Sequence, residues 1–122
     1  MARSTLIALG AVNGALAVAA GAFGAHALRD RLETRALEIF ETGARYQMYH
    51  ALAMVLAGLV AAKGIPGATT AGWLFQIGIV IFSGSLYALA LTDVKVLGAI
   101  TPIGGVAMLA GWVWLAYTAW RG

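Results

Sequence analysis

Residues 64–92 read GIPGATTAGWLFQIGIVIFSGSLYALALT and contain no charged side chain. An α-helix rises about 1.5 Å per residue, so roughly 20 apolar residues cross the hydrocarbon core of a bilayer, which is about 30 Å thick. This run is long enough to cross with residues to spare. It therefore predicts a transmembrane helix, and the rest of the chain can be read outward from it.

Three further uncharged stretches, residues 4–28, 46–62 and 96–120, flank this run, and the charged residues fall between the stretches. The chain of 122 residues is 61% hydrophobic and only 11% charged, whereas soluble domains contain about 25% charged residues. So few polar groups could not cover the surface of a soluble domain of this length. We therefore expect residues 1–122 to form a single all-α integral membrane domain without a soluble module.

The linking segments predict how the apolar stretches are connected. We expect membrane helices over residues 5–27, 46–62, 71–91 and 103–120. The links before the third and fourth helices are short, and short links favour antiparallel neighbours. The sequence thus predicts a four-transmembrane-helix up-down bundle with both termini on the same side of the membrane.

The link between the first two membrane helices is longer and has a regular pattern. Its apolar residues recur every three or four positions from Leu32 to Gly43, which is the period of an amphipathic helix. Glu41 and Arg45 are four residues apart, a spacing that allows an ion pair on one helix face. We therefore expect a short amphipathic helix over residues 31–43 that lies in the membrane interface and is either separate from the helix over residues 46–62 or continuous with it.

Positive charge is unevenly divided between the two sides of the predicted bundle. Five basic residues lie on the side opposite the termini and three on the side of the termini. The five are Arg29, Arg31, Arg35, Arg45 and Lys95, and the three are Arg3, Lys63 and Arg121. Loops rich in lysine and arginine stay in the cytoplasm, so we expect periplasmic termini.

The net charge of +3 also bears on partners and cofactors. The basic residues lie beside helix ends, so lipid headgroups rather than nucleic acid are the expected counter-ions. The chain has no cysteine, which excludes disulfides, thiolate metal sites and iron–sulfur clusters. It also has no G-x-S-x-G, H-E-x-x-H or P-loop motif. We therefore predict no catalytic residues, no metal and no cofactor.

Small residues recur at every fourth position on each predicted helix. In lipid, such residues let helix backbones approach closely, and dispersion then stabilises the contact. Because every helix has such a stripe, we favour packing within the bundle over grooves for self-association. The glycines expected at these contacts are Gly10, Gly14, Gly21, Gly84 and Gly111.

Polar side chains gather towards the side opposite the termini. The candidate polar cluster consists of His26, Tyr46, Gln47, Tyr49, His50, Ser83, Ser85, Tyr87 and Thr101. Polar groups within a membrane are costly and often functional. We favour a structural interpretation, in which neutral histidines bond to groups on neighbouring helices. The alternatives are a haem held by His26 and His50 at one depth, a zinc site completed by carboxylates, and a proton or solute relay.

Several segments together resemble one protein family. They are GAFGAH at residues 21–26, ETGARYQMYHAL at 41–52, FSGSLY at 82–87 and GAITPIGG at 98–105. These segments look like signatures of the YgdD-like family of small bacterial inner-membrane proteins, and the resemblance covers essentially the whole chain. It implies four membrane helices, a multi-pass protein of the cell inner (plasma) membrane, and a family of unknown function with no established enzyme activity.

The sequence leaves functions from different classes open. Missing catalytic motifs, short loops and abundant packing glycines favour a non-catalytic structural or accessory subunit. Its expected partners are membrane lipids and either further copies of itself, as a homo-oligomer, or a larger membrane complex. The alternative is a small transporter or channel-like protein that uses the polar cluster, and a haem- or quinone-binding membrane protein is a third hypothesis.

Overall fold

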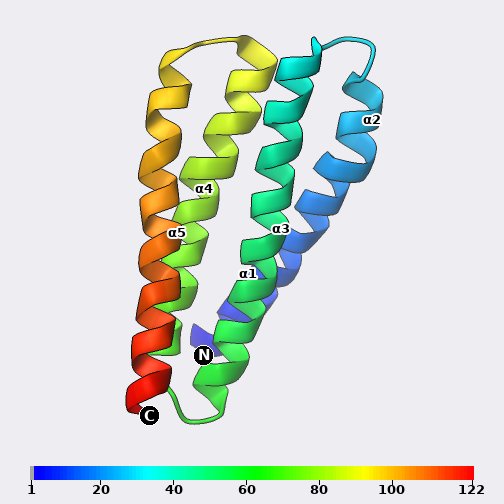
Figure 1. Cartoon of the computed structure of the whole chain (residues 1–122). Helices are drawn as coiled ribbons and strands as arrows, with labels where there is room; N and C mark the ends of the chain where they lie inside the picture. Colours follow the sequence, from blue (N-terminus) through cyan, green and yellow to red (C-terminus); the bar gives the residue numbers. More distant parts are fainter. Residues whose placement is uncertain (1) are drawn as a thin grey trace.

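Four long helical rods make up the protein (Figure 1). The computed structural model describes residues 2–122, and every regular element within these residues is a helix. The first rod consists of three consecutive elements, which are α1 (Ala2–Val18), the π-helix η1 (Ala19–Gly24) and α2 (Ala25–Leu28). Each of the other rods is a single helix: α3 (Thr34–Ala62), α4 (Ala68–Thr92) and α5 (Val96–Arg121). The predicted all-α class is confirmed.

Three of the rods are long and apolar enough to cross a membrane, namely Ala2–Leu28, Ala68–Thr92 and Val96–Arg121. The remaining rod, α3, is 29 residues long and carries charged side chains in its first half. The N- and C-termini both lie towards the end of the bundle that carries the α3–α4 link (Figure 1). We call this the terminal end, and the other the opposite end.

Helix α3 joins two segments that the sequence distinguishes. The sequence predicts an interfacial helix over residues 31–43 that is either separate from the membrane helix starting at residue 46 or continuous with it, and in the structure a single helix runs from Thr34 to Ala62. Its first turns belong to the bundle because Phe40 is buried against Ala25 of α2 and against α4. Tertiary packing, rather than the membrane interface, therefore covers the apolar face of this segment.

The ends of α4 and α5 also differ from the predicted boundaries. Helix α5 begins at residue 96 rather than 103, so Pro102 lies inside it. Proline lacks the N–H that would bond to the Gly98 carbonyl one turn back, but membrane helices accept proline more often than soluble helices do. In the same turn Thr101 Oγ1 donates to the neighbouring Leu97 carbonyl at 3.1 Å, which does not replace the lost bond. Helix α4 ends at Thr92. The next residue, Asp93, bonds through its N–H to the Leu89 carbonyl, and its left-handed backbone (φ 57°) turns the chain out of the helix.

The rods pack in the order α1, α3, α4, α5, each along the length of the next. Helix α1 contacts α4 from Leu6, which lies against Gly72, to Asn13, which is bonded to Gln76, and beyond Asn13 it leans away from α4 towards the opposite end (Figure 1). The main hydrophobic core consists of Leu6, Ala53, Met54, Ala71, Phe75, Ile79 and Met108. The divergence of α1 from α4 leaves an open groove between them beyond this core.

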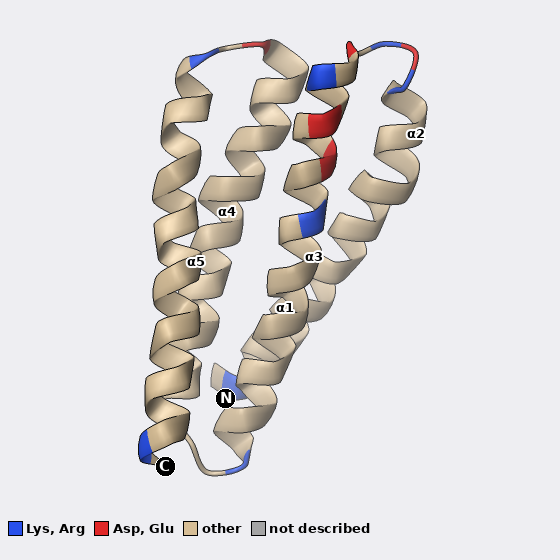
Figure 2. Ribbon diagram, in the orientation of Figure 1, with Lys and Arg blue, Asp and Glu red and all other residues tan. Residues whose placement is uncertain are grey.

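Charged side chains occupy the two ends of the bundle, and α3 carries them furthest inward (Figure 2). The last of them, Arg45, lies about 16 Å along the axis from the start of α3. Arg45 Nη2 donates to Thr42 Oγ1 at 3.2 Å, so the guanidinium reaches back towards the opposite end. The predicted Glu41–Arg45 ion pair is not formed. Within residues 2–122 the only ion pair joins Lys95 Nζ to Asp93 Oδ1 at 2.6 Å.

Glycines permit the closest backbone approaches between helices. A Cβ on Gly10 of α1 would lie 2.8 Å from the Ala51 carbonyl oxygen of α3. A Cβ on Gly104 of α5 would lie 2.8 Å from Phe82 Cα of α4. At both crossings a larger residue would have to push a helix backbone away, because the obstructing atoms are not at the end of a flexible side chain.

The five predicted packing glycines differ in their surroundings. Gly10 and Gly111 lie at close contacts, and a Cβ on Gly21 would make an ordinary contact at 3.5 Å. A Cβ on Gly14 or Gly84 would meet no heavy atom within 4 Å. Gly14 and Gly84 therefore do not pack within the bundle, contrary to expectation, because spacing alone does not say which way a stripe faces.

The crossing of α4 and α5 can be tested with two adjacent glycines. Gly104→Ala should lower the free energy of unfolding by about 1–3 kcal/mol, the usual cost of overpacking, because its Cβ meets the Phe82 backbone. Gly105→Ala is the matched control, since its Cβ would lie 3.8 Å from the Phe82 ring and it gains the same helix propensity. Thermal unfolding in mild detergent, followed by circular dichroism, measures both. Equal stability of the two variants would contradict the close crossing.

Candidate functional site

A chain of side-chain hydrogen bonds joins three helices near the middle of the bundle. Tyr87 OH of α4 donates to Gln47 Oε1 of α3 at 2.7 Å, and Gln47 Nε2 donates to Asn13 Oδ1 of α1 at 3.1 Å. Asn13 Nδ2 then donates to Gln76 Oε1 of α4 at 2.8 Å. We call these four residues the amide network. Asn13 lies about 17 Å along its rod from Ala2, so the network lies deep between the two ends.

The backbone of Leu9 sets the direction of the amide network. Its carbonyl oxygen accepts a hydrogen bond from Asn13 Nδ2 at 2.9 Å. A carbonyl oxygen can only accept, so the nitrogen of Asn13 must face Leu9 and its oxygen must face Gln47. Each following amide is oriented in the same way, with its oxygen towards a donor. Hydrogen bonds aligned like this polarise one another where the local dielectric constant is low.

The amide network ends in a donor that the protein does not use. Gln76 Oε1 accepts from Asn13, but Gln76 Nε2 has no hydrogen-bond partner in the part of the chain that the structure describes. Gln76 is half-buried in the wall of a groove of about 510 Å³ between α1 and α4, which we call the amide groove. Its lining consists of Asn13, Leu16, Ala20, Gln47, Gln76, Ile79, Val80, Ser83, Gly84 and Tyr87.

His50 forms a second polar contact, which joins α3 to α5. Its Nδ1 bonds to the Tyr46 carbonyl at 2.8 Å, and its Nε2 lies 3.0 Å from Nε1 of Trp112. An indole N–H only donates, so His50 Nε2 must accept and the proton must be on Nδ1. The ring is therefore a neutral histidine with both nitrogens engaged.

Hydroxyl groups form the remaining bonds between helices. Ser83 Oγ of α4 donates to the Gly43 carbonyl of α3 at 2.7 Å. Ser85 Oγ of α4 and Thr101 Oγ1 of α5 lie 2.5 Å apart. The first bond needs a small residue at position 43, because a Cβ on Gly43 would lie 3.0 Å from Cε1 of Tyr87. Each bond ties α4 to one of its two main neighbours.

The structure divides the predicted polar cluster instead of gathering it into one site. Seven of its nine members belong to the three groups of contacts just described. The other two, His26 and Tyr49, are exposed, and their side chains make no hydrogen bond among residues 2–122. The cluster therefore works as separate contacts between helices.

The two histidines do not share one depth, which corrects a further expectation. His26 lies two residues from the end of α2, whereas His50 lies about 24 Å along α3 from its first residue. The expectation failed because α3 begins at Thr34, twelve residues before the predicted start. Since the His50 ring already bonds on both sides, a haem ligated by this pair does not fit the geometry.

Sequence reasoning missed two members of the amide network, Asn13 and Gln76, because each stands alone in a long apolar run. A signal was present in the composition. The chain has a single asparagine and two glutamines, and all three carboxamides meet in the amide network. Because an amide within a membrane needs a partner on another helix, the rarity of these residues could have predicted that they meet.

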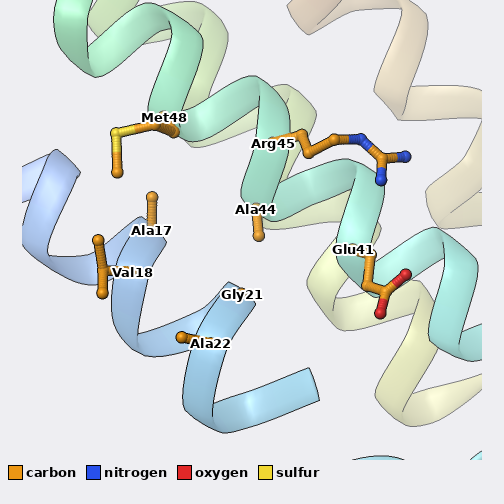
Figure 3. Close-up of a pocket in the computed structure, with 8 residues that line it drawn as sticks. All are labelled: Ala17, Val18, Gly21, Ala22, Glu41, Ala44, Arg45 and Met48. Atoms are coloured by element: carbon orange, nitrogen blue, oxygen red, sulfur yellow. The ribbon is translucent and has the colours of Figure 1, made fainter. Parts of the chain in front are cut away.

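A second groove, of about 470 Å³, runs between η1 and α3 (Figure 3). A π-helix widens one turn and often occurs at functional sites. Ala17 before it and Ala25 after it are both buried. The charged head of Arg45 points away from η1, while the side chain of Ala44 points towards Gly21 (Figure 3). This groove thus presents mostly small apolar groups, and we assign no chemistry to it.

The buried polar groups are engaged in hydrogen bonds within the protein. Every buried side-chain nitrogen and oxygen atom within residues 2–122 has a hydrogen-bond partner. The same residues contain no group of three or more histidine, aspartate or glutamate side chains that could hold a metal ion. The amide groove differs from these hydrogen-bonded contacts because one donor in its wall, Gln76 Nε2, has no partner within residues 2–122 and lies beside an open apolar surface.

Long apolar rods joined by buried amides define an integral membrane protein. The chain belongs to the family described as "Protein of unknown function (DUF423)", whose profile matches residues 20–105. No solved structure matches it.

Named relatives support the same class. The UPF0382 membrane protein YwdK of Bacillus subtilis (strain 168) is 50% identical over 115 residues, which cover 93% of this chain and 94% of the relative. A UPF0382 membrane protein of Staphylococcus epidermidis is 52% identical over 107 residues, or 88% of each chain. The UPF0382 membrane protein SAB0533 of Staphylococcus aureus is 46% identical over 115 residues, or 94% of each chain.

The contribution of the amide network can be measured with a pair of identical substitutions. Tyr87→Phe removes the hydroxyl that donates to Gln47 and should lower the free energy of unfolding by about 0.6 kcal/mol, the average for hydrogen bonds between membrane helices, and by no more than about 1.7 kcal/mol. Tyr49→Phe is the control, since the Tyr49 hydroxyl has no partner within residues 2–122. Chemical unfolding of both variants in mixed micelles tests this. A Tyr87→Phe protein as stable as Tyr49→Phe would argue against the network.

Proposed function

We infer that the protein is a non-catalytic structural or accessory subunit of the inner membrane, with four membrane-crossing helices. The observation that carries this inference is the use made of its intramembrane polar groups. The amide network joins α1, α3 and α4, and the His50–Trp112 and Ser85–Thr101 contacts attach α5. Groups engaged in this way are not free to act as general acids, bases or nucleophiles.

The second half of α3 is the proposed fourth crossing. Residues 46–62 are uncharged and span about 26 Å, close to the roughly 30 Å of a bilayer core. Arg45 and Lys63 flank this segment, and such side chains can extend their charged heads to the interface. Helix α3 also packs along α1 and α4, which are both candidate spans, so it shares their depth.

The orientation proposed here follows from the charges at the two ends of the bundle. The opposite end carries five basic side chains and the terminal end three, which favours a cytoplasmic opposite end and periplasmic termini. The motifs that resemble YgdD-like proteins support the inner membrane as the location, and the relatives are named membrane proteins.

Single cysteines can test the number of crossings cleanly, because the chain has no cysteine of its own. With four crossings, Arg31→Cys and Lys95→Cys should react with an impermeant maleimide from the same side of the membrane, and Lys63→Cys from the other side. All three positions are exposed. If α3 did not cross, positions 31 and 95 would be labelled from opposite sides.

Association is the test of the accessory role. Native mass spectrometry of gently extracted protein should show a defined homo-oligomer or a larger complex. We expect α5 to face the partner, because only 17% of this candidate span is buried, the lowest share of the three. Val113→Cys, 67% exposed, should therefore be crosslinked to the partner, whereas the buried Met108→Cys control should not. An isolated monomer that catalyses a reaction or carries a solute flux would overturn the proposal.

A further inference from the structure

We propose that the amide groove binds an apolar molecule that carries an uncharged carbonyl oxygen, and that this oxygen accepts a hydrogen bond from Gln76 Nε2. This role goes beyond the structural one, because it uses the one end of the amide network that holds no helix. Three features of the groove support it: the unused donor, the slender shape and the uncharged lining.

The first feature is the donor itself. Asn13 Nδ2 directs its two hydrogens at the Leu9 carbonyl at 2.9 Å and at Gln76 Oε1 at 2.8 Å, with the Met54 sulfur a weaker third acceptor at 3.7 Å. Turning the Gln76 amide over would place its nitrogen against that of Asn13, donor against donor, so Nε2 is held facing away from Asn13. No water is available in the hydrocarbon core, and an amide donor left unsatisfied there costs about 1–3 kcal/mol. A ligand with an acceptor would recover this energy.

The second feature is the shape of the groove. It extends along α4 from Gln76 to Tyr87, a rise of about 16 Å. A volume of about 510 Å³ spread over this length describes an elongated groove, which suits a slender molecule that lies along α4.

The third feature is the chemistry of the lining. Leu16, Ile79 and Val80 supply apolar walls, and no lining residue carries a charge. A charged ligand would lose its hydration without gaining a counter-ion, and a wholly apolar ligand would leave Gln76 Nε2 unsatisfied. An uncharged carbonyl on an apolar body meets both conditions. Membranes contain two sources of this chemistry, isoprenoid quinones and the acyl esters of glycerolipids.

Two matched glycine substitutions separate the groove from the rest of the fold. Gly84 lines the groove, and a Cβ there would meet no heavy atom within 4 Å, so Gly84→Leu should fill the groove without disturbing the amide network. Gly14 has equally open surroundings but does not line the groove, which makes Gly14→Leu the control. Gln76→Met removes the donor, together with the Oε1 that accepts from Asn13, and keeps the length of the side chain.

The experiment measures what the purified full-length protein retains. Wild type and the three variants are extracted from membranes in mild detergent and checked for helicity by circular dichroism. Bound molecules are then recovered in organic solvent and quantified per protein by mass spectrometry. We expect a stoichiometric quinone or glycerolipid with wild type and Gly14→Leu, none with Gly84→Leu, and about 2- to 10-fold less with Gln76→Met, as expected for the loss of one hydrogen bond.

A direct readout of the hydrogen bond uses a short-chain benzoquinone labelled with ¹³C at its carbonyls as the probe. Its C=O stretching band should move to lower wavenumber in wild type and Gly14→Leu, and stay at the free position in Gln76→Met and Gly84→Leu. The retained molecule identifies the source, and a glycerolipid in place of a quinone also supports the proposal. An empty wild-type protein with an unshifted probe would overturn it. So would full retention by Gly84→Leu, or a groove closed by a second copy of the chain.

Discussion

Asn13 donates the two hydrogens of its amide to the Leu9 carbonyl and to Gln76, and the arrangement of the buried polar groups follows from this. The Leu9 carbonyl cannot donate, so the asparagine has one orientation, and Gln47 and Tyr87 must align with it. Three helices are thereby held in a fixed register by neutral groups. No ion pair contributes to this register, since the one ion pair within residues 2–122 is exposed at the opposite end.

The same constraint explains why α1 and α4 are in contact towards the terminal end and diverge towards the opposite end. In lipid, apolar faces gain little by meeting each other, so helices associate through close packing and buried polar bonds. Gly10 lets α1 and α3 touch, and Leu6 fits against Gly72 where α1 and α4 meet. Beyond Asn13 no such contact holds α1 to α4. The amide groove is the consequence, and it exposes the end of the hydrogen-bonded chain.

Much of the fold could be predicted from where the charges are absent. Uncharged runs identify the rods formed by α1, α4 and α5, because few soluble folds tolerate such composition. The start of α3 could not be found in this way, since its charged first half is held by the burial of Phe40 against α2 and α4 rather than by hydropathy. Starting this helix at residue 46 placed His50 at the same predicted depth as His26. The sequence therefore predicted a single polar cluster that the structure does not form.

The candidate site was harder to predict than the fold. Gln47 and Tyr87 stand out as polar residues beside other polar residues, and the sequence analysis included them. Asn13 and Gln76 do not stand out locally, and only the three-dimensional arrangement shows that they complete the amide network. Helical period and spacing describe each helix separately, whereas hydrogen-bond partners depend on how one helix is rotated against the next.

Because the chain has only three carboxamide side chains, nuclear magnetic resonance can observe each of them separately. In protein labelled with ¹⁵N and ¹³C at asparagine and glutamine, correlations across hydrogen bonds should connect Asn13 Nδ2 to the side-chain carbonyl of Gln76, and Gln47 Nε2 to that of Asn13. Observation of both correlations would support the account, and amides of Asn13 and Gln47 without either correlation would contradict it.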